Sequence, residues 1–327
     1  MKCKHRFVEI LGGLCLLLTP ALRGTTLTET FASDPTQTGW RTTGDSNLFD
    51  WQADTEDLAV TWDSARSNSF FYLPLNTILS RSDSFTIGFT VRLDDIAAGT
   101  TTGKPYTFEI AIGLLNLSKA TRTGFLRGTG SDSTDLVEWD YFPDSGFGAT
   151  VAGAMISDSN HWATSFNDPL ELVAGSSYQF TMDYRAETQT MTIQMLTGGS
   201  STNLQAIVLT SAFDDFHVDT FAISSYSDAG QDPQYAGSVV AHGEVDDISL
   251  ILPPPPVQDF SGALIQNHWQ ASFVGQTNWL YDLESSADLR TWTRVTSPVP
   301  GVGLSQTLTD PGPVLPMGFY RLEAIKP

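Results

Sequence analysis

Cysteine is nearly absent from this chain. Its 2 cysteines among 327 residues are Cys3 and Cys15, and both lie in the first 24 residues. That segment has a basic start, a short apolar stretch and small residues near Ala21 and Gly24, the order that is typical of a secretory signal peptide. We predict that residues 1–24 are a signal peptide. The exported chain then has no cysteine, so disulfides and thiolate chemistry are excluded.

Basic residues are also scarce. The chain has 17 Lys and Arg against 37 Asp and Glu, and a net charge of −20. A surface this acidic repels nucleic acid and anionic lipid, whereas it suits neutral polysaccharide, cations or solubility alone. The apolar stretch of the leader is too short to cross a bilayer, so we expect no transmembrane segment. We expect the protein to be secreted or extracytoplasmic, at the cell surface or in the periplasm.

Helical periodicity is missing after the leader. Apolar and polar residues alternate from Ser84 to Leu93, and again from Tyr178 to Tyr184 and from Met191 to Met195 around a turn. A period of two predicts half-buried strands, and the last two segments predict a hairpin. Further strands are expected at Leu58–Trp62, Thr107–Leu115, Leu136–Phe142, Thr220–Ser225 and Val245–Leu252. Many short strands with little helix predict an all-β protein of antiparallel sheets packed as a sandwich.

Four consecutive prolines, Pro253 to Pro256, interrupt the strand pattern. Proline cannot donate a hydrogen bond to a sheet and favours a stiff, extended chain. We therefore predict a β-sandwich domain over residues 25–252, a linker over residues 253–256 and a small C-terminal β-sandwich module over residues 257–327. Aromatic and aliphatic residues alternate in that module, as at Trp279, Tyr281 and Leu283, and they predict a separate small core.

The segment that most suggests chemistry is Leu136 to Asp144. On a strand, Glu138 and Asp140 lie on one face, about 7 Å apart, and Trp139 and Tyr141 lie on the other. Two neighbouring carboxylates can hold a divalent cation or flank a glycosidic bond. The alternative is an ordinary solvated sheet face in an acidic protein. The spacing alone leaves both interpretations open.

From Thr28 to Leu252 the chain resembles the concanavalin-like jelly-roll superfamily, which includes legume lectins, laminin-G-like modules and a group of glycoside hydrolases. The resemblance is carried by the segment Phe31–Trp40, the hairpin Tyr178–Met195, the ending Val245–Ile248 and, above all, Val137–Asp140 with Pro143 and Asp144. Carried over by position, it implies metal ligation by the side chains of Glu138, Asp140 and Asp144 and by the carbonyl of Phe142. Two further expected ligands are replaced by Ala149 and Ala154. The resemblance therefore implies at most one weak calcium site.

The hydrolases of this superfamily carry a Glu-x-Asp-x-x-Glu strand whose two glutamates act as nucleophile and acid. Here Pro143 stands at the position of the second glutamate. Proline cannot transfer a proton, so the retaining mechanism lacks its acid. The sequence thus favours a protein that is not an enzyme.

Exposed aromatic rings bind sugars, because the apolar C–H faces of a pyranose pack on them. Trp139, Tyr141 and Trp162 lie beside the acidic segment or beside polar loops. We predict that these three residues contact a glycan.

The C-terminal module contains Ser285-Ser286-Ala287-Asp288-Leu289-Arg290-Thr291-Trp292 and later Phe319-Tyr320-Arg321. This pattern resembles a fibronectin-like module at the ends of large secreted proteins of environmental bacteria. The resemblance implies an accessory or surface-association domain of unassigned ligand.

Together these observations predict a secreted, non-catalytic protein that binds carbohydrate or mediates adhesion. Two alternatives remain: a glycoside hydrolase or lyase that uses Glu138 and Asp140, and a purely structural protein of the cell surface. Convergence of Glu138, Trp139 and Tyr141 in an open groove would separate the carbohydrate-binding protein and the hydrolase or lyase from the purely structural protein.

Overall fold

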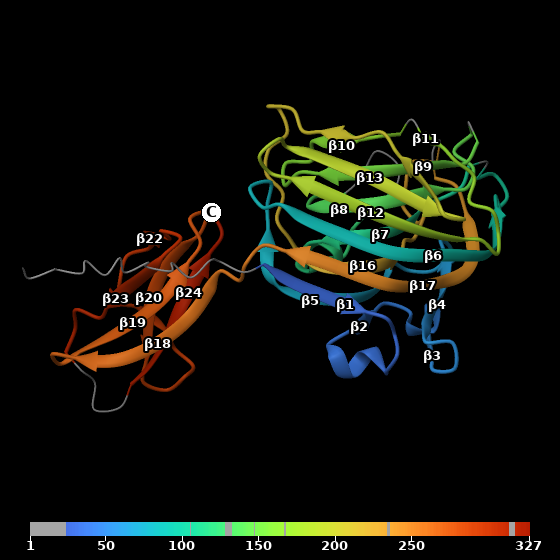
Figure 1. Cartoon of the computed structure of the whole chain (residues 1–327). Coiled ribbons are helices and arrows are strands. Elements are labelled where there is room, and N and C mark those ends of the chain that lie inside the picture. The colour runs from blue at the N-terminus through green and yellow to red at the C-terminus, as the bar shows by residue number, and fades with distance from the viewer. Residues whose placement is uncertain are drawn as a thin grey trace, which may run out of the picture. The chain divides into compact units, whose positions relative to one another are not determined.

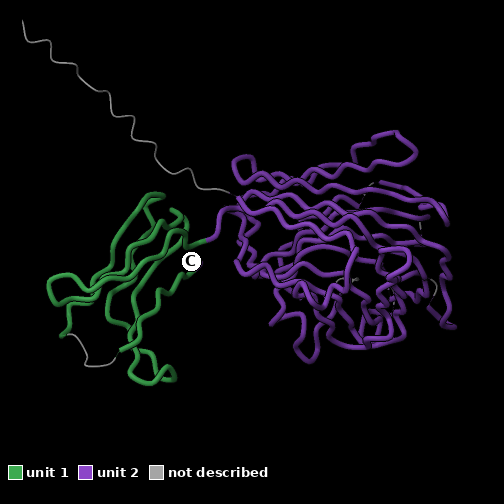
Figure 2. Tube along the Cα trace, turned by 60° about the horizontal axis from the view of Figure 1, so that its bottom comes forward, with its two compact units in different colours: residues 1–23, 256–325, 327 green, residues 24–255, 326 purple. Residues whose placement is uncertain are grey.

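The structure is a computed structural model that describes residues 24–104, 106–127, 133–146, 148–166, 168–233, 236–313 and 318–327. Residues 1–23 of the predicted signal peptide, including both cysteines, lie outside these ranges. The described chain forms two compact units, Gly24–Pro255 and Pro256–Ile325 (Figure 2). None of the helices in the described ranges has the length and apolar character needed to span a bilayer.

The larger unit consists of two antiparallel sheets that lie one over the other (Figure 1). The nine-stranded sheet contains, in spatial order, β14 (Ser200–Asn203), β13 (Thr190–Thr197), β12 (Ser177–Arg185), β6 (Phe85–Ala98), β17 (Val239–Leu252), β4 (Asp57–Asp63) and β3 (Phe49–Gln52), with β1 (Thr25–Glu29) beside β17 and β15 (Ile207–Val208) beside β13. The two-sheet, all-β sandwich predicted from the sequence is confirmed.

The eight-stranded sheet carries the segment of chemical interest. Its spatial order is β10 (Trp162–Thr164), β9 (Thr150–Ile156), β8 (Leu136–Phe142), β7 (Ile110–Leu115), β16 (Val218–Ser225), β5 (Ser69–Leu79) and β2 (Arg41–Thr43), with β11 (Asp168–Pro169) beside β9. The helical elements of the described chain are short: η1 (Pro35–Thr38), η2 (Ser46–Leu48) and α1 (Leu117–Ala120). Helix α1 follows β7 directly, so it lies at one end of this sheet.

Alternating apolar residues of both sheets form the core between them. Ile87, Phe89 and Val91 of β6 and Phe180 of β12 have essentially no exposed surface. Phe180 packs against Trp139 of β8, which belongs to the other sheet, at a ring-centroid distance of 4.7 Å. The alternation read from the sequence therefore identifies the inward faces of these strands correctly.

The smaller unit also consists of two antiparallel sheets. One contains β18 (Val257–Ile265), β19 (His268–Gly275) and β23 (Ser305–Thr309), and the other contains β21 (Thr293–Arg294), β20 (Leu280–Ser286) and β22 (Val299–Pro300), with β24 (Phe319–Ile325) beside β20. Phe273 of the first sheet packs against Tyr281 of the second at 4.9 Å. Both residues are buried, so this unit has its own core.

Candidate functional site

Strand β8 spans Leu136–Phe142 and is buried on both faces. Trp139 and Tyr141 point into the core of the sandwich, where each exposes 1% of its surface or less. Phe89 and Phe180 pack against the Trp139 ring, and the Tyr141 hydroxyl accepts a hydrogen bond from the Leu172 amide at 3.1 Å. A sugar cannot reach either ring. The prediction that Trp139 and Tyr141 bind a glycan is wrong, because both rings fill the core.

Glu138 and Asp140 lie on the opposite face of β8, which we call the outer face of the eight-stranded sheet. Their neighbours across the ladders are small: Gly113 and Ala154 flank Glu138, and Ala111 and Ala152 flank Asp140. A Cβ atom on Gly113 would lie 2.3 Å from the Val137 carbonyl oxygen, so only glycine fits there. These small residues leave room above both carboxylates for another side chain.

Arg127 occupies that room. Its Nε atom lies 2.8 Å from Glu138 Oε2 and its Nη2 atom lies 2.7 Å from Asp140 Oδ2. Its Nη1 atom lies 3.2 Å from Glu109 Oε2. All four side chains are at least 98% buried. The guanidinium thus holds three carboxylates together beneath the surface, where unpaired charges would cost several kcal/mol each.

Tyr226 completes this buried cluster. Its hydroxyl donates a hydrogen bond to Glu138 Oε1, and its ring packs on Phe70 and Phe125 at 5.8 Å. Burial, reinforced by the negative charge of Glu138, raises the pKa of Tyr226 well above its ordinary value of 10.0. Tyr226 therefore stays protonated and acts as a fixed hydrogen-bond donor.

The predicted metal ligands do not form one site. Glu138 and Asp140 are committed to Arg127, whereas Asp144 is exposed in the loop after β8 and its Oδ1 atom accepts a bond from the Gly146 amide at 2.9 Å. Among the described residues, the one group of three acidic or histidine side chains with ligand atoms within 4.8 Å of one another is Asp282, Glu284 and Glu323. The predicted cation site at Glu138, Asp140 and Asp144 is therefore not assembled. The alternative interpretation, an ordinary solvated sheet face, is wrong too, because Arg127 covers both carboxylates.

Trp162, the third aromatic residue predicted to bind a glycan, is on the surface. It begins the edge strand β10, exposes 43% of its surface and donates its indole N–H to Asn160 Oδ1 at 3.2 Å. Phe166, four residues further along, is 41% exposed and packs edge-on against Phe142. Phe166 is not among the residues that the sequence predicted to bind a glycan. The edge of the sheet therefore presents two open aromatic rings.

A polar group precedes Trp162. His161 Nδ1 lies 3.0 Å from both Ser159 Oγ and Asp214 Oδ2, and the Ser159 hydroxyl donates to the same Asp214 oxygen. The bond from Ser159 lowers the pKa of Asp214 below its ordinary value. A catalytic triad places the serine on one ring nitrogen of the histidine and the acid on the other. Here both contact Nδ1, so the group does not activate a nucleophile.

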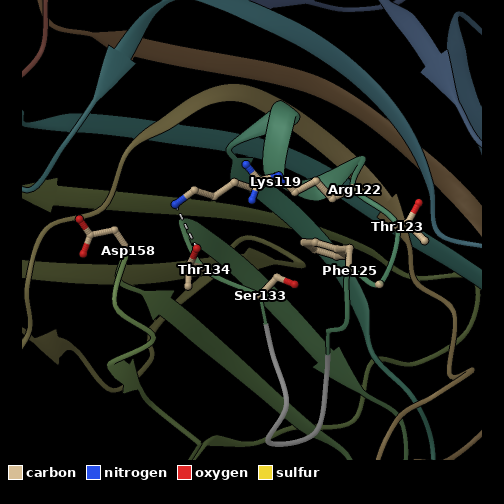
Figure 3. Close-up of a pocket in the computed structure, with 8 residues that line it drawn as sticks. Lys119, Arg122, Thr123, Phe125, Ser133, Thr134 and Asp158 are labelled. Atoms are coloured by element: carbon tan, nitrogen blue, oxygen red, sulfur yellow. Dashed lines mark hydrogen bonds between the residues drawn. The ribbon is translucent and has the colours of Figure 1, made fainter.

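A hollow of about 410 Å³ lies beside α1 (Figure 3). Its wall is formed by Lys119, Arg122, Thr123, Gly124, Phe125, Ser133, Thr134 and Asp158. The Lys119 side chain extends from α1 toward Thr134 and donates to its hydroxyl at 3.1 Å. Lys119 also pairs with the fully buried carboxylate of Asp135. Its ammonium group is therefore fixed at the wall of the hollow.

The hollow and Trp162 lie at the same end of the sheet. Leu136 is the register partner of Ile156, and Ile156 is the partner of Trp162. Residues directly opposite each other share a face, so the Trp162 ring lies on the outer face, two strand spacings or about 10 Å from Leu136. Thr134 is two residues from Leu136, and Asp158 is two residues from Ile156. Both Thr134 and Asp158 line the hollow. An exposed indole and a polar hollow are thus neighbours on one surface.

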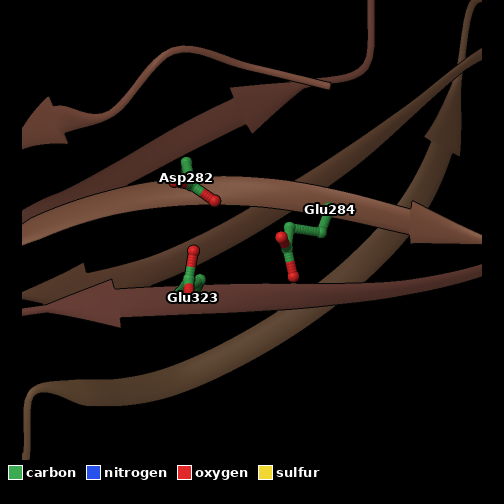
Figure 4. A group of neighbouring side chains, drawn as sticks. All are labelled: Asp282, Glu284 and Glu323. Carbon is green, nitrogen blue, oxygen red and sulfur yellow. The ribbon is translucent and has the colours of Figure 1, made fainter. Parts of the chain in front are cut away.

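The smaller unit contains the acidic group with metal-like spacing (Figure 4). Arg294 Nε lies 2.6 Å from Asp282 Oδ2, Arg294 Nη2 lies 3.2 Å from Glu323 Oε2, and Arg321 Nη2 lies 2.6 Å from Glu284 Oε2. Burial raises the pKa of Asp282 above its ordinary value of 3.8 despite Arg294. Two arginines already neutralise most of this negative charge, so the group is an ion-pair network between β20, β21 and β24.

No family model matches the sequence, and no curated protein matches it. Similar solved structures include peanut lectin with a 9mer peptide, at 12% identity and a TM-score of 0.44, covering 69% of this chain and 98% of that chain. A legume lectin-like domain from Entamoeba histolytica has 9% identity and a TM-score of 0.40, covering 68% and 95%. The alginate lyase Aly36B has 10% identity and a TM-score of 0.37, covering 69% and 96%. Likenesses at this level carry no argument about binding or catalysis.

Proposed function

We propose that the protein is a non-catalytic carbohydrate-binding protein and that it binds glycan at the edge strand β10. The observation that carries this proposal is the exposed indole of Trp162, which Asn160 orients through the N–H group. Aromatic rings with one wet polar edge are suited to the mixed apolar and polar surface of a sugar. Phe166 extends the apolar contact along the same edge.

The carboxylates that suggested hydrolysis do not support an enzyme. A retaining or inverting glycosidase needs two carboxyl groups on either side of a bound sugar. Glu138 and Asp140 are instead covered by Arg127 and are at least 98% buried. A substrate has no access to them. The hydrolase or lyase alternative is therefore not supported at these residues.

The setting of the protein belongs to the same proposal. We propose that the chain is exported after removal of residues 1–24, acts at the cell surface or in the periplasm of a bacterium, and uses residues 257–327 as a fibronectin-like accessory module. Calcium is not part of the proposed function. Glu138 and Asp140 are paired with Arg127, and the remaining acidic group is paired with Arg294 and Arg321.

We further propose that residues 25–252 and 257–327 fold independently. The boundary between the two compact units falls between Pro255 and Pro256 of the chain, and each unit has its own buried core. Limited proteolysis is expected to cut near the four prolines and release two resistant fragments. Unfolding of the C-terminal fragment after its release would contradict independent folding.

A glycan array with the purified protein tests the binding proposal. Trp162→Ala is expected to abolish binding and Trp162→Phe to retain part of it, because phenylalanine keeps a ring. Ile251→Ala is the matched control, since Ile251 is 52% exposed and belongs to β17 of the other sheet. A Trp162→Ala variant that binds as well as the unaltered protein, or a protein that binds no glycan at all, would refute the proposal. The second result would leave a purely structural surface protein.

A further inference from the structure

The charge in the hollow beside α1 is unusual for this protein. Acidic residues outnumber basic ones by 37 to 17, and most arginines of the larger unit are paired with carboxylates or carbonyls, as Arg66, Arg81, Arg92 and Arg127 are. Arg122 lines the hollow and is exposed. Within the described ranges, its guanidinium makes no hydrogen bond and no ion pair. A free guanidinium fork is thus available to a ligand.

Lys119 supplies a second positive group in the hollow. Its partner Asp135 is fully buried and accepts a further bond from the His217 amide at 2.6 Å, so the pair is anchored to the interior. An ammonium group has three donors, and the bonds to Asp135 and Thr134 use two of them. The third donor remains for a ligand in the hollow.

The other lining groups are suited to a sugar. Ser133, Thr134 and Thr123 provide hydroxyls, and the Ser133 hydroxyl is positioned by the Leu126 amide at 3.2 Å. The exposed carboxylate of Asp158 provides an acceptor for sugar hydroxyls. Because Asp158 and the net charge of −20 repel a densely charged polymer, the hollow suits a single anionic group better than a polyanion.

We infer that the hollow binds an isolated acidic group of the glycan, a carboxylate or a sulfate ester, through Arg122 and Lys119. Guanidinium matches the geometry of both anions with two parallel hydrogen bonds, and such charge-assisted bonds are the stronger ones in proteins. The inference rests on the proposed function, because the glycan that carries the acid also contacts Trp162. Trp162 is about 10 Å from Leu136 across the sheet, and Leu136 is two residues from Thr134 in the wall of the hollow, so one oligosaccharide reaches both.

The experiment uses oligosaccharides of xylan, galactan and mannan. Each is prepared in three matched forms: unsubstituted, with one glucuronate, and with one sulfate ester. Binding is measured by calorimetry for the unaltered protein, Arg122→Gln and Arg41→Gln. Arg41 is exposed at β2, the opposite edge of the same sheet, so its variant removes the same charge far from the hollow. We expect an acid-bearing ligand to bind about tenfold more tightly than its unsubstituted form. Arg122→Gln should remove that advantage, whereas Arg41→Gln should keep it.

The remaining outcomes separate the two proposals. Equal binding of acid-bearing and unsubstituted ligands, or equal losses in both arginine variants, overturns the acid site. If binding still depends on Trp162 in that case, the proposed function stands. Binding of none of the oligosaccharides, together with a negative glycan array, overturns the proposed function and the acid site with it. The glucuronate and sulfate arms show which anion the hollow prefers.

Discussion

Arg127 Nε and Glu138 Oε2 lie 2.8 Å apart, and both side chains are almost completely buried. Because of this contact, the acidic residues of β8 are buried and paired, and they are not available as metal ligands. The carboxylates of Glu138, Asp140 and Glu109 are held in place by one guanidinium. Removing one partner of a buried ion pair leaves uncompensated charge, which costs more than the pair contributed.

Arg127→Met is therefore expected to destabilise the larger unit by about 3 to 5 kcal/mol at neutral pH. The deficit should shrink as the pH falls, because protonation of the abandoned carboxylates removes their buried charge. Urea denaturation followed by tryptophan fluorescence measures the effect at several pH values. Arg122→Met is the control and should change stability little. A variant at Arg127 as stable as the control would show that the cluster contributes nothing.

Calcium should leave the melting temperature of the protein unchanged. The site predicted at Glu138, Asp140 and Asp144 is not assembled, because Arg127 occupies two of the carboxylates and Asp144 lies in an exposed loop. Thermal melts with calcium and with a chelator check this expectation. A shift of several degrees that disappears in Asp144→Asn would restore Asp144 as a ligand.

The smaller unit should lose stability as the pH rises through the raised pKa of Asp282. A carboxyl group whose pKa is higher in the folded state binds its proton more tightly there. Its contribution is thus fully present below the ordinary value of 3.8 and is lost above the folded-state value. Asp282→Asn should flatten this dependence, while Asp259→Asn, an exposed site on β18, should leave it intact. Urea titrations followed by the NMR signals of β20 amides give the comparison. Identical slopes in both variants would assign the dependence to other groups.

The sequence predicts the strands of this protein well and their environment poorly. Leu136–Phe142 is a strand in the structure with the same bounds, and the alternation in β6 and β12 identifies the core faces. Alternation shows that two faces of a strand differ, but it does not show what covers each face. Arg127 and Tyr226 are 11 and 88 residues from Glu138, and no local pattern marks either. Glu138 is therefore buried, although the local pattern predicted that its side chain lies on an accessible face.

One residue of the candidate site, Trp162, could be predicted from the sequence. Trp162 could be identified because it lies among polar loop residues. Trp139 lies in a strand among apolar neighbours, and this environment is typical of a core residue. Lys119 and Arg122 follow β7 in a short helix and a loop. Their proximity to Ser133 and Asp158 results from the order of β7, β8 and β9 in the sheet, which spacing along the chain does not reveal.

The two tryptophans offer a direct test of this division between core and surface. Trp139→Ala should destabilise the larger unit by about 3 to 5 kcal/mol, because it leaves a cavity between Phe89 and Phe180. Trp162→Ala should change stability by less than about 0.5 kcal/mol, since the ring is 43% exposed, and yet it should abolish glycan binding. Urea denaturation gives the stabilities, and the glycan array gives the binding. Trp139→Phe serves as the control for the core, because it retains most of the buried ring and should recover much of the loss. If Trp162→Ala were as destabilising as Trp139→Ala, its lost binding would reflect unfolding, and Trp162 would no longer support a binding site.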